Sequence, residues 1–242
     1  MDQKAFCETL ANTFDRLGLS PLLTEEKQEK FYHLYRRLCE ENEKYNLTAL
    51  ADGKSVILLH FADSLMGQAY IKEGASLLDM GCGAGFPSLP LAICRPNLAV
   101  TAADATAKKI GFVEKMKEEL SLSNLTPLVA RAEVEGKGPL RDSFDAVTAR
   151  AVASLPMLCE LCAPFVKKGG LFLAMKGRDG LAELEAARHA IGELRCKVEF
   201  TKEYEISDGD TTHERVLLLL RKIAPTPEAY PRAFARIKSR PL

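Results

Sequence analysis

The hydrophobic and polar positions divide the chain into an N-terminal part with helical spacing and a longer part in which strands and helices alternate. Phe6, Leu10, Phe14 and Leu17 recur at the interval of one helix face, which predicts a first helix that ends near Gly18. A second helix is predicted where a capping residue and two acidic residues precede an apolar stripe: Thr24, Glu25 and Glu26, then Phe31, Leu34, Tyr35 and Leu38. One or two short helices are expected over 56–69, so we predict an N-terminal helical extension over residues 1–72.

From Leu77 onward, short apolar runs of strand length alternate with helical segments. The predicted strands are 77–80, 98–103, 126–130, 144–149, 170–175, 197–204 and 215–221. The predicted helices are 86–94, 106–120, 155–166 and 181–194. This alternation favours a mostly parallel sheet with helices on both faces. The short polar turn between the last two strands predicts a closing hairpin with one antiparallel strand. The expected fold is therefore α/β and doubly wound, with a seven-stranded domain over 73–223 and a tail over 224–242.

The loop between the first predicted strand and its helix is almost free of side chains. Asp79 stands near the end of the strand, and Gly81, Gly83 and Gly85 follow at every second position before Phe86. A strand, a glycine loop and a helix N-terminus together allow a cofactor to lie against the backbone. A glycine-rich turn without a ligand is the alternative interpretation.

The spacing of the loop distinguishes between cofactors. The dinucleotide fingerprint places its third glycine three residues after its second, where this chain has the bulky Phe86. The Gly-Lys-Ser/Thr of a triphosphate-binding loop does not follow. An acidic residue, alternating glycines and an aromatic residue are typical of enzymes that use S-adenosylmethionine (SAM). A dinucleotide-dependent oxidoreductase is the competing enzyme class.

In doubly wound sheets the ligand lies beyond the carboxyl ends of the strands, so each strand end is a candidate site. Asp104 ends the second strand, where a carboxylate accepts the ribose hydroxyls of an adenosine; capping of the next helix is its alternative role. Ala132 and Glu133 follow the third strand and could contact the edge of the adenine ring, although Glu133 could equally be an ordinary solvated carboxylate.

Arg150 ends the fourth strand, at the position that faces both cofactor and acceptor. Methylases of exocyclic amines carry Asn/Asp-Pro-Pro-aromatic there, and methylases of pyrimidine carbon use a Pro-Cys nucleophile; this chain has neither. The acceptor should therefore need neither deprotonation nor covalent activation. Guanine N7, a free lone pair on the major-groove edge, fits this requirement. We expect catalysis by positioning alone, with no catalytic side chain required.

The overall charge indicates no partner, because 33 basic residues balance 33 acidic ones. Locally, residues 221–242 carry six basic side chains against Glu228 alone. We predict RNA contacts from this tail and from the mouth of the site, at Lys108, Lys109, Lys176, Arg232 and Arg236. A solubilising end, and a solvated helix face for Lys108 and Lys109, are the alternatives.

The cysteines and the hydropathy favour a cytoplasmic protein. The seven cysteines are scattered, and no signal peptide or apolar run of membrane-spanning length is present, which indicates a reducing compartment. Cys159 and Cys162 form a single Cys-x-x-Cys without a second pair, so we predict no metal site. We expect no membrane partner and a monomer.

Several short motifs occur in a characteristic order along nearly the whole chain. They are Tyr45-Asn46-Leu47-Thr48, His60-Phe61-Ala62-Asp63-Ser64-Leu65, Asp79 to Pro87, Arg131-Ala132-Glu133, Arg150-Ala151-Val152-Ala153, Lys176-Gly177, Thr226-Pro227 and Tyr230-Pro231-Arg232. In this order they resemble the bacterial small-subunit ribosomal RNA guanine-N7 methyltransferase G family, also called glucose-inhibited division protein B. The chain departs from the family pattern at Ser88, where many members have glycine, and after Arg232 in the tail.

The resemblance implies a SAM-dependent methyltransferase with a Rossmann-like fold that methylates N7 of a guanine in the 530 loop of 16S rRNA. It implies SAM contacts at Gly81, Phe86, Ala132, Glu133 and Arg150. It leaves the roles of His60 and Asp63 open, and a packing pair between the extension and the sheet is the simplest reading. Methylation of another RNA or a small molecule, and an inactive RNA-binding protein of this fold, are the alternatives.

Overall fold

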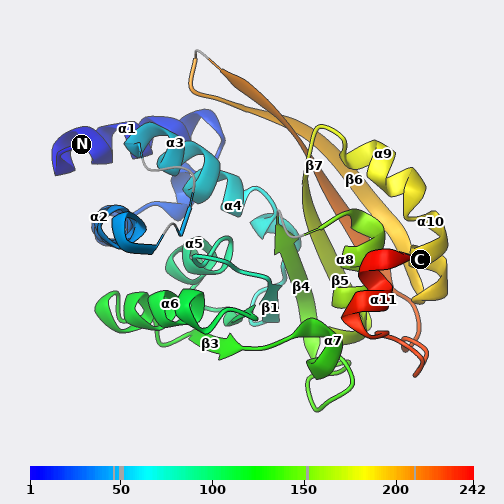
Figure 1. The fold of residues 1–242 in the computed structure, drawn as a ribbon. Helices are drawn as coiled ribbons and strands as arrows, with labels where there is room; N and C mark the ends of the chain where they lie inside the picture. The colour runs from blue at the N-terminus through cyan, green and yellow to red at the C-terminus, as the bar shows by residue number, and fades with distance from the viewer. Residues whose placement is uncertain (46, 49–51, 151–152, 210) are drawn as a thin grey trace.

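One seven-stranded sheet organises the molecule (Figure 1), in the order β3-β2-β1-β4-β5-β7-β6. The computed structural model describes residues 1–45, 47–48, 52–150, 153–209 and 211–242. Asn46, Ala151 and Val152 of the sequence motifs lie outside the described residues. The strands are β1 (Ser76–Met80), β2 (Ala99–Asp104), β3 (Leu125–Val129), β4 (Phe144–Arg150), β5 (Val166–Gly177), β6 (Cys196–Ser207) and β7 (Thr212–Lys222). The first five pair in parallel, and β7 is antiparallel to both β5 and β6. The predicted mostly parallel, doubly wound sheet with a closing hairpin is confirmed.

Helices cover both faces of this sheet. The N-terminal helices are α1 (Gln3–Arg16), α2 (Glu25–Tyr45), α3 (Gly53–Ser55) and α4 (Asp63–Leu65), with a π-helical segment, η2 (Val56–Ala62), between the last two. The helices between strands are α5 (Ser88–Cys94), α6 (Ala107–Glu119), α7 (Ala132–Glu135), α8 (Leu155–Cys162), α9 (Gly180–Ala186) and α10 (Arg188–Glu193). Single 3₁₀ turns lie at η1 (Ser20–Leu22), η3 (Gln68–Tyr70) and η4 (Ala163–Phe165), and α11 (Phe234–Ser239) ends the chain.

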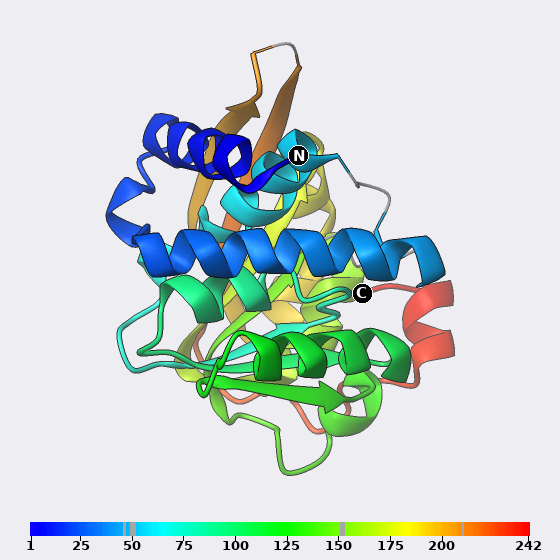
Figure 2. The ribbon, with the colours of Figure 1, turned by 90° about the vertical axis from the view of Figure 1, so that its left-hand side faces the viewer.

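Two apolar cores lie on opposite faces of the sheet. One combines the N-terminal helices with α5 and α6, and includes Phe6, Phe31 and Phe61. Figure 2 shows α2 running across this side of the molecule beside α5 and α6. The other core combines α8 to α11 with the opposite face and includes Phe165 and Phe172. The N-terminal helices therefore pack directly on the sheet domain; the predicted boundaries at 72 and 223 stay a prediction.

The predicted elements differ from the observed ones mainly at their ends. The helix predicted over 155–166 ends at Cys162, because Pro164 opens a 3₁₀ turn and β5 already begins at Val166. The helix predicted over 181–194 is divided into α9 and α10 at Ala187. Both hairpin strands extend further than predicted, because most of β6 is exposed and therefore shows no apolar alternation. Among the described helices, none combines the length and apolarity needed to cross a membrane.

Candidate functional site

The glycine loop after β1 adopts backbone angles that favour glycine. Gly81, Gly83 and Gly85 have φ of 76°, 59° and 92°, in the left-handed region. The Gly81 amide donates a 2.7 Å hydrogen bond to the carbonyl of Ala103 on β2, which anchors the loop to the neighbouring strand. A Cβ at Gly85 would collide with the side chain of Leu89, so this glycine is required for the packing of α5. At Gly83 a Cβ would meet no protein atom within 4 Å.

Asp79 lies beneath the loop rather than in it. Its side chain is fully buried and accepts hydrogen bonds from the Ser88 amide (3.0 Å) and the Thr148 hydroxyl (3.4 Å). Burial raises the pKa of this carboxyl to about 6, although these hydrogen bonds and Arg150 oppose the rise. Asp79 thus joins the end of β1 to the start of α5, which begins at Ser88 rather than at the predicted Phe86.

Asp104 is connected to the glycine loop by a direct hydrogen bond. One carboxylate oxygen accepts from the Gly83 amide at 3.1 Å, and the other accepts from the Thr106 amide at 2.8 Å. The Lys109 ammonium lies 4.0 Å away. The N-cap of α6 is Thr106, and Asp104 accepts the amide of that residue, so Asp104 is not itself the helix cap. The ribose contact stays a prediction.

A cavity of about 640 Å³ opens at the carboxyl ends of the strands, in front of the glycine loop. Its walls come from five places: the loop, the N-terminal extension, the start of α6, the ends of β4 and β5 with the start of α9, and the start of β7. The lining residues are Leu47, Thr48, Leu59, His60, Asp63, Gly81, Cys82, Gly83, Ala84, Phe86, Lys109, Arg150, Met175, Lys176, Gly177, Asp179, Glu183 and Arg215. The cavity lies beside the point where the sheet order reverses between β1 and β4, the usual ligand position in such folds.

Arg150 is held at the cavity wall by the N-terminal extension. Its guanidinium donates to the Leu59 carbonyl at 2.7 Å and to the Asp63 carboxylate at 3.3 Å, and lies 5.7 Å from the centre of the Phe86 ring. Asp63 is 4 % exposed and also accepts from the Tyr204 hydroxyl (3.1 Å) and from Arg215 Nε (3.3 Å). One buried carboxylate therefore connects the extension with β4, β6 and β7.

His60 forms an aromatic pair with Phe86 at the cavity. The two rings stack with centroids 4.5 Å apart and planes at 5°. Burial and the nearby Arg150 lower the pKa of His60 to about 3, so the imidazole is neutral at physiological pH. Its Nδ1 lies 3.3 Å from a guanidinium nitrogen of Arg150 and its Nε2 lies 2.7 Å from the Thr48 hydroxyl. Because Arg150 can only donate, Nδ1 accepts and Nε2 carries the proton. His60 and Asp63 are thus packed and hydrogen-bonded, as the simplest reading predicted, and both also line the cavity.

The residues predicted to bind adenosine are only partly gathered at this cavity. Gly81, Gly83, Phe86 and Arg150 line it, whereas Asp104, Ala132 and Glu133 do not. The last two begin α7 directly after β3, whose end pairs with Asp104 through Val129. The predicted adenosine residues therefore lie on adjacent strand ends, to one side of the cavity.

The lysines predicted to bind RNA differ in environment. Lys108 is exposed on α6, and Lys109 lines the cavity. The Lys176 side chain is only 8 % exposed, and its ammonium donates to the Ala153 carbonyl and to Glu183, both at 2.8 Å. Since two of its three donors serve partners in the protein, its contact with RNA stays a prediction that the geometry does not support.

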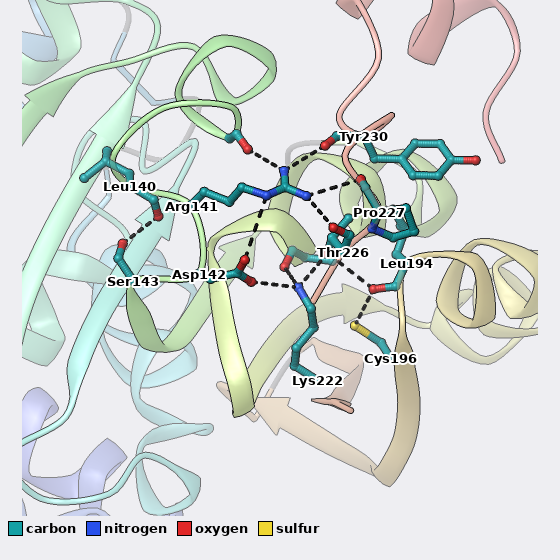
Figure 3. Close-up of polar contacts among 12 residues, drawn as sticks. Leu140, Arg141, Asp142, Ser143, Leu194, Cys196, Lys222, Thr226, Pro227 and Tyr230 are labelled. Atoms are coloured by element: carbon teal, nitrogen blue, oxygen red, sulfur yellow. Dashed lines mark hydrogen bonds and ion pairs between the residues drawn. The ribbon is translucent and has the colours of Figure 1, made fainter. Parts of the chain in front are cut away.

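Hydrogen bonds attach the start of the C-terminal tail to the body of the protein (Figure 3). The Arg141 guanidinium donates to the main-chain carbonyls of Thr226, Pro227 and Tyr230, and to that of Gly136, which directly follows α7. The buried Lys222 ammonium donates to the Thr226 hydroxyl at 2.5 Å and lies 3.5 Å from the Asp142 carboxylate. The segment that leads to α11 is therefore fixed at several points.

Only part of the positive charge of the tail is available at the surface. Arg221 pairs with Glu199, and Arg232 forms a bidentate pair with Glu160, a carboxylate with 0 % exposure. Arg236 is exposed and has no side-chain partner among the described residues. Arg232 would therefore have to bind RNA while paired with Glu160, whereas the Arg236 side chain is exposed. Both RNA contacts stay predictions.

The sequence interpretation missed three cavity residues with polar side chains: Asp179, Glu183 and Arg215. Arg215 had a usable signal. β7 runs antiparallel to β5 and begins where β5 ends, with Arg215 opposite Gly177. The first residues of an antiparallel strand therefore lie at the same edge as the carboxyl ends of the parallel ones. Among the described residues, no group of three or more His, Cys, Asp or Glu side chains is arranged to hold a metal ion.

Comparisons with known proteins agree on one family. The family model for rRNA small subunit methyltransferase G matches residues 27–211. A protein of Staphylococcus saprophyticus named Ribosomal RNA small subunit methyltransferase G is 45 % identical over 212 residues, which is 87 % of this chain and 88 % of the relative. The protein of the same name from Staphylococcus aureus strain Newman is 44 % identical over the same shares.

Solved structures resemble the fold at lower identity. The crystal structure of M. jannaschii TYW2 in complex with AdoMet matches with a TM-score of 0.51 and 18 % identity, over 63 % of this chain and 71 % of that one. A putative transferase from Pyrococcus horikoshii matches with a TM-score of 0.54 and 16 % identity, over 66 % and 62 %. These matches indicate the Rossmann-like methyltransferase fold.

Proposed function

The chain belongs to the rRNA small subunit methyltransferase G family, and from this premise we propose that it methylates N7 of a guanine in the 530 loop of 16S rRNA. It is a SAM-dependent methyltransferase that acts on small-subunit ribosomal RNA. The proposal concerns the acceptor atom, the target nucleotide and the residues that hold cofactor and RNA.

The glycine loop fits a cofactor that lies against the backbone. A Cβ at Gly83 would project into open space, and Gly81, two residues earlier, lines the same cavity. SAM, when bound, supplies a methyl group on a sulfonium centre that needs no further activation. We propose that Gly81, Gly83, Phe86 and Arg150 surround its methionine end, while Asp104, Ala132 and Glu133 hold its adenosine.

The cavity offers little capacity to take a proton from an acceptor, and this observation supports guanine N7 as the acceptor atom. Among the described carboxylate and imidazole side chains that line the cavity, all but Asp179 are unsuited to taking a proton or already engaged. His60 has a pKa of about 3, Asp63 is bonded to two guanidinium groups, and Glu183 is paired with Lys176. Asp179 is the exception, and it lies at the exposed rim. Guanine N7 has a lone pair and loses no proton when it is methylated, so this site suits it.

The protein's contribution to the reaction is then orientation and exclusion of water. Phe86 and His60 form a rigid wall of two stacked rings, and Arg150 is fixed against it by Leu59 and Asp63. A rigid wall holds two reactants in line, which accounts for catalysis without a general base.

The test is the position of the methyl group. Small-subunit RNA from cells with and without the protein is digested, and N7-methylguanosine is mapped by mass spectrometry. We expect one N7-methylguanosine in the 530 loop that is lost without the protein and restored when the purified protein and SAM are added. A mark at another atom, another RNA or a small molecule would contradict the acceptor but not the methyltransferase. With a ribosomal substrate we further propose a cytoplasmic protein, and a monomer, which light scattering of the purified chain would test.

A further inference from the structure

Arg215 stands at the entrance of the cavity, and neither the glycine loop nor the family motifs account for it. It lines the central cavity of about 640 Å³ and also two surface hollows of about 580 and 320 Å³ beside the β6–β7 hairpin. A group that enters the cavity from this side therefore passes Arg215. The cofactor residues Gly81 and Phe86 lie on the glycine loop and line only the central one of these three spaces.

The two arginines at Asp63 differ in how many donors they have left. Arg150 uses Nη1 for Leu59 and Asp63, and its Nη2 faces His60. Arg215 donates from Nε to the Asp63 carboxylate, and from Nη1 it donates one N–H to the main-chain carbonyl of its neighbour Glu214. Within the described residues, both N–H groups of its Nη2 have no acceptor. Its side chain is 22 % exposed, compared with 13 % for Arg150.

Asp63 fixes the direction of these donors. Its carboxylate is 4 % exposed and receives Arg150, Arg215 and the Tyr204 hydroxyl, so it cannot rotate without breaking several contacts. One carboxylate against two guanidinium groups leaves a positive charge at the entrance. A base that presents an acceptor atom there is favoured, and one that presents an amino group is disfavoured.

We propose that Arg215 donates a hydrogen bond to O6 of the target guanine, and that Asp63 is the positioning residue that directs it. This inference rests on the proposed function. On the major-groove edge of guanine, O6 lies next to N7 and both are acceptors, whereas adenine carries an amino group in place of O6. Since N7 must stay free to receive the methyl group, an arginine at this edge can donate only to O6. Arg215 then selects guanine over adenine.

The experiment compares guanine and adenine at the target. Small-subunit particles are reconstituted from transcribed RNA with either base, and kcat/KM for methyl transfer is measured for wild type, Arg215→Met and Arg215→Lys. Loss of one charge-assisted hydrogen bond should lower kcat/KM on guanine by about 10- to 100-fold and narrow the guanine-to-adenine ratio by a similar factor. Arg215→Lys should restore part of the ratio. The Kd of SAM should stay within about twofold in both Arg215 variants, which also shows that they are folded.

Two matched controls separate base selection from general effects. Arg178 lines the neighbouring hollows but not the central cavity, so Arg178→Met removes a nearby charge and should keep the ratio. Tyr204→Phe removes one hydrogen bond to Asp63 but leaves both arginine contacts in place, so it should narrow the guanine-to-adenine ratio less than Asp63→Asn does. Asp63→Asn alone should narrow the guanine-to-adenine ratio of kcat/KM. When Asp63→Asn is added to Arg215→Met, the ratio should not narrow further.

The inference and the proposed function fail in different ways. An unchanged ratio in Arg215→Met, with normal transfer to guanine by the wild type, would overturn only the role of Arg215. A loss of SAM affinity with an unchanged ratio would assign Arg215 to the carboxylate of the cofactor. A wild type that transfers no methyl group to the guanine particles would overturn both.

Discussion

A carboxyl group with 0 % exposure near the end of β1 is the clearest case of a single residue that shapes the site. Asp79 accepts the Ser88 amide, so it fixes the start of α5 and with it the far end of the glycine loop. Desolvation raises its pKa to about 6 against an ordinary value of 3.8. The folded protein therefore binds a proton at Asp79 in a pH range where the unfolded chain has already released it.

This shift makes stability depend on pH. Because the folded-state pKa is raised, the stabilisation is complete below about pH 4 and is lost as the pH rises through about 6. We expect wild type to lose roughly 2 to 3 kcal/mol of unfolding free energy relative to Asp79→Asn between pH 4 and pH 7. Urea unfolding of both proteins over this range measures the difference. Parallel curves would mean that Asp79 titrates normally.

Two glycines in the same backbone conformation allow the cofactor contact to be isolated. Gly83 (φ 59°) lines the cavity, whereas Gly18 (φ 69°) follows α1, and an added Cβ meets nothing within 4 Å at either position. Alanine at either should cost about 1 to 2 kcal/mol of stability through backbone strain. Only Gly83→Ala should weaken SAM binding, by about tenfold or more, as measured by calorimetry. Equal SAM affinities in the two variants would contradict the proposed position of the cofactor.

At the scale of elements, the sequence predicts the sheet better than its edges. β1, β2, β4 and β5 contain buried apolar runs, so alternation with helices is enough to identify them. β3 has only one buried residue, Leu125, and is identified by its place in the same alternation. The outer hairpin is exposed along most of β6, and its length comes from pairing with β7 rather than from burial. Periodicity cannot locate the ends of a strand whose two faces are both solvated.

The site follows the same logic. Residues at the carboxyl ends of parallel strands, such as Arg150, are predictable, because the topology alone brings those ends together. Arg215 depends on which late strand is antiparallel, and Lys176 depends on its pairing with Glu183. Pairing partners distant in sequence leave no mark in the spacing, so the burial of Lys176 and of the Arg232–Glu160 pair could not be predicted.

The junction of α11 with α8 depends on a buried ion pair. Arg232 is the bidentate partner of Glu160, whose side chain is fully buried. Arg232→Met should lower the unfolding free energy by roughly 3 to 5 kcal/mol, because it leaves a buried charge without a partner. The double variant Glu160→Met with Arg232→Met should recover most of this loss, and exposed Arg236→Met should change stability by less than about 0.5 kcal/mol. Urea unfolding of the four proteins is the measurement; a mild effect of Arg232→Met would mean that Glu160 takes up a proton or water instead.

At the scale of the whole molecule, the C-terminal strap, residues 226–231, is attached to the segment that follows α7. Arg141 holds Gly136 after α7 and Tyr230 before α11 with the same guanidinium, and Pro231 packs against Gly136. Since α7 carries the proposed adenosine residues, Arg141→Met should raise the Kd of SAM by about 3- to 10-fold and expose the tail to trypsin. Arg195→Met, with its exposed side chain on a turn, is the control. If trypsin cleaved the tail of Arg141→Met while the Kd of SAM stayed unchanged, the attachment of the tail would have no influence on the cofactor site.

RNA binding by a protein with no net charge requires that positive charge be concentrated on one surface. The chain has 33 basic and 33 acidic residues, and three of the six basic residues in 221–242, Arg221, Lys222 and Arg232, are paired within the protein. The remaining charge of the tail lies on and beside α11, at the opposite end of the molecule from α1 (Figure 1). If α11 binds RNA phosphates, its charges will determine part of the salt dependence of binding.

Removing two of these charges tests that surface directly. Arg236→Met with Lys238→Met should flatten the plot of log K against log salt by roughly 0.7 to 0.9 for each phosphate that is no longer neutralised, while SAM affinity stays unchanged. The matched control removes Lys4 and Arg16 from α1, which are also exposed and lie far from α11. Filter binding of small-subunit RNA over a salt series gives both slopes. Both double variants remove two exposed positive charges and differ only in where those charges lie. Equal slopes would therefore mean that the charges on α11 make no specific contact with RNA phosphates.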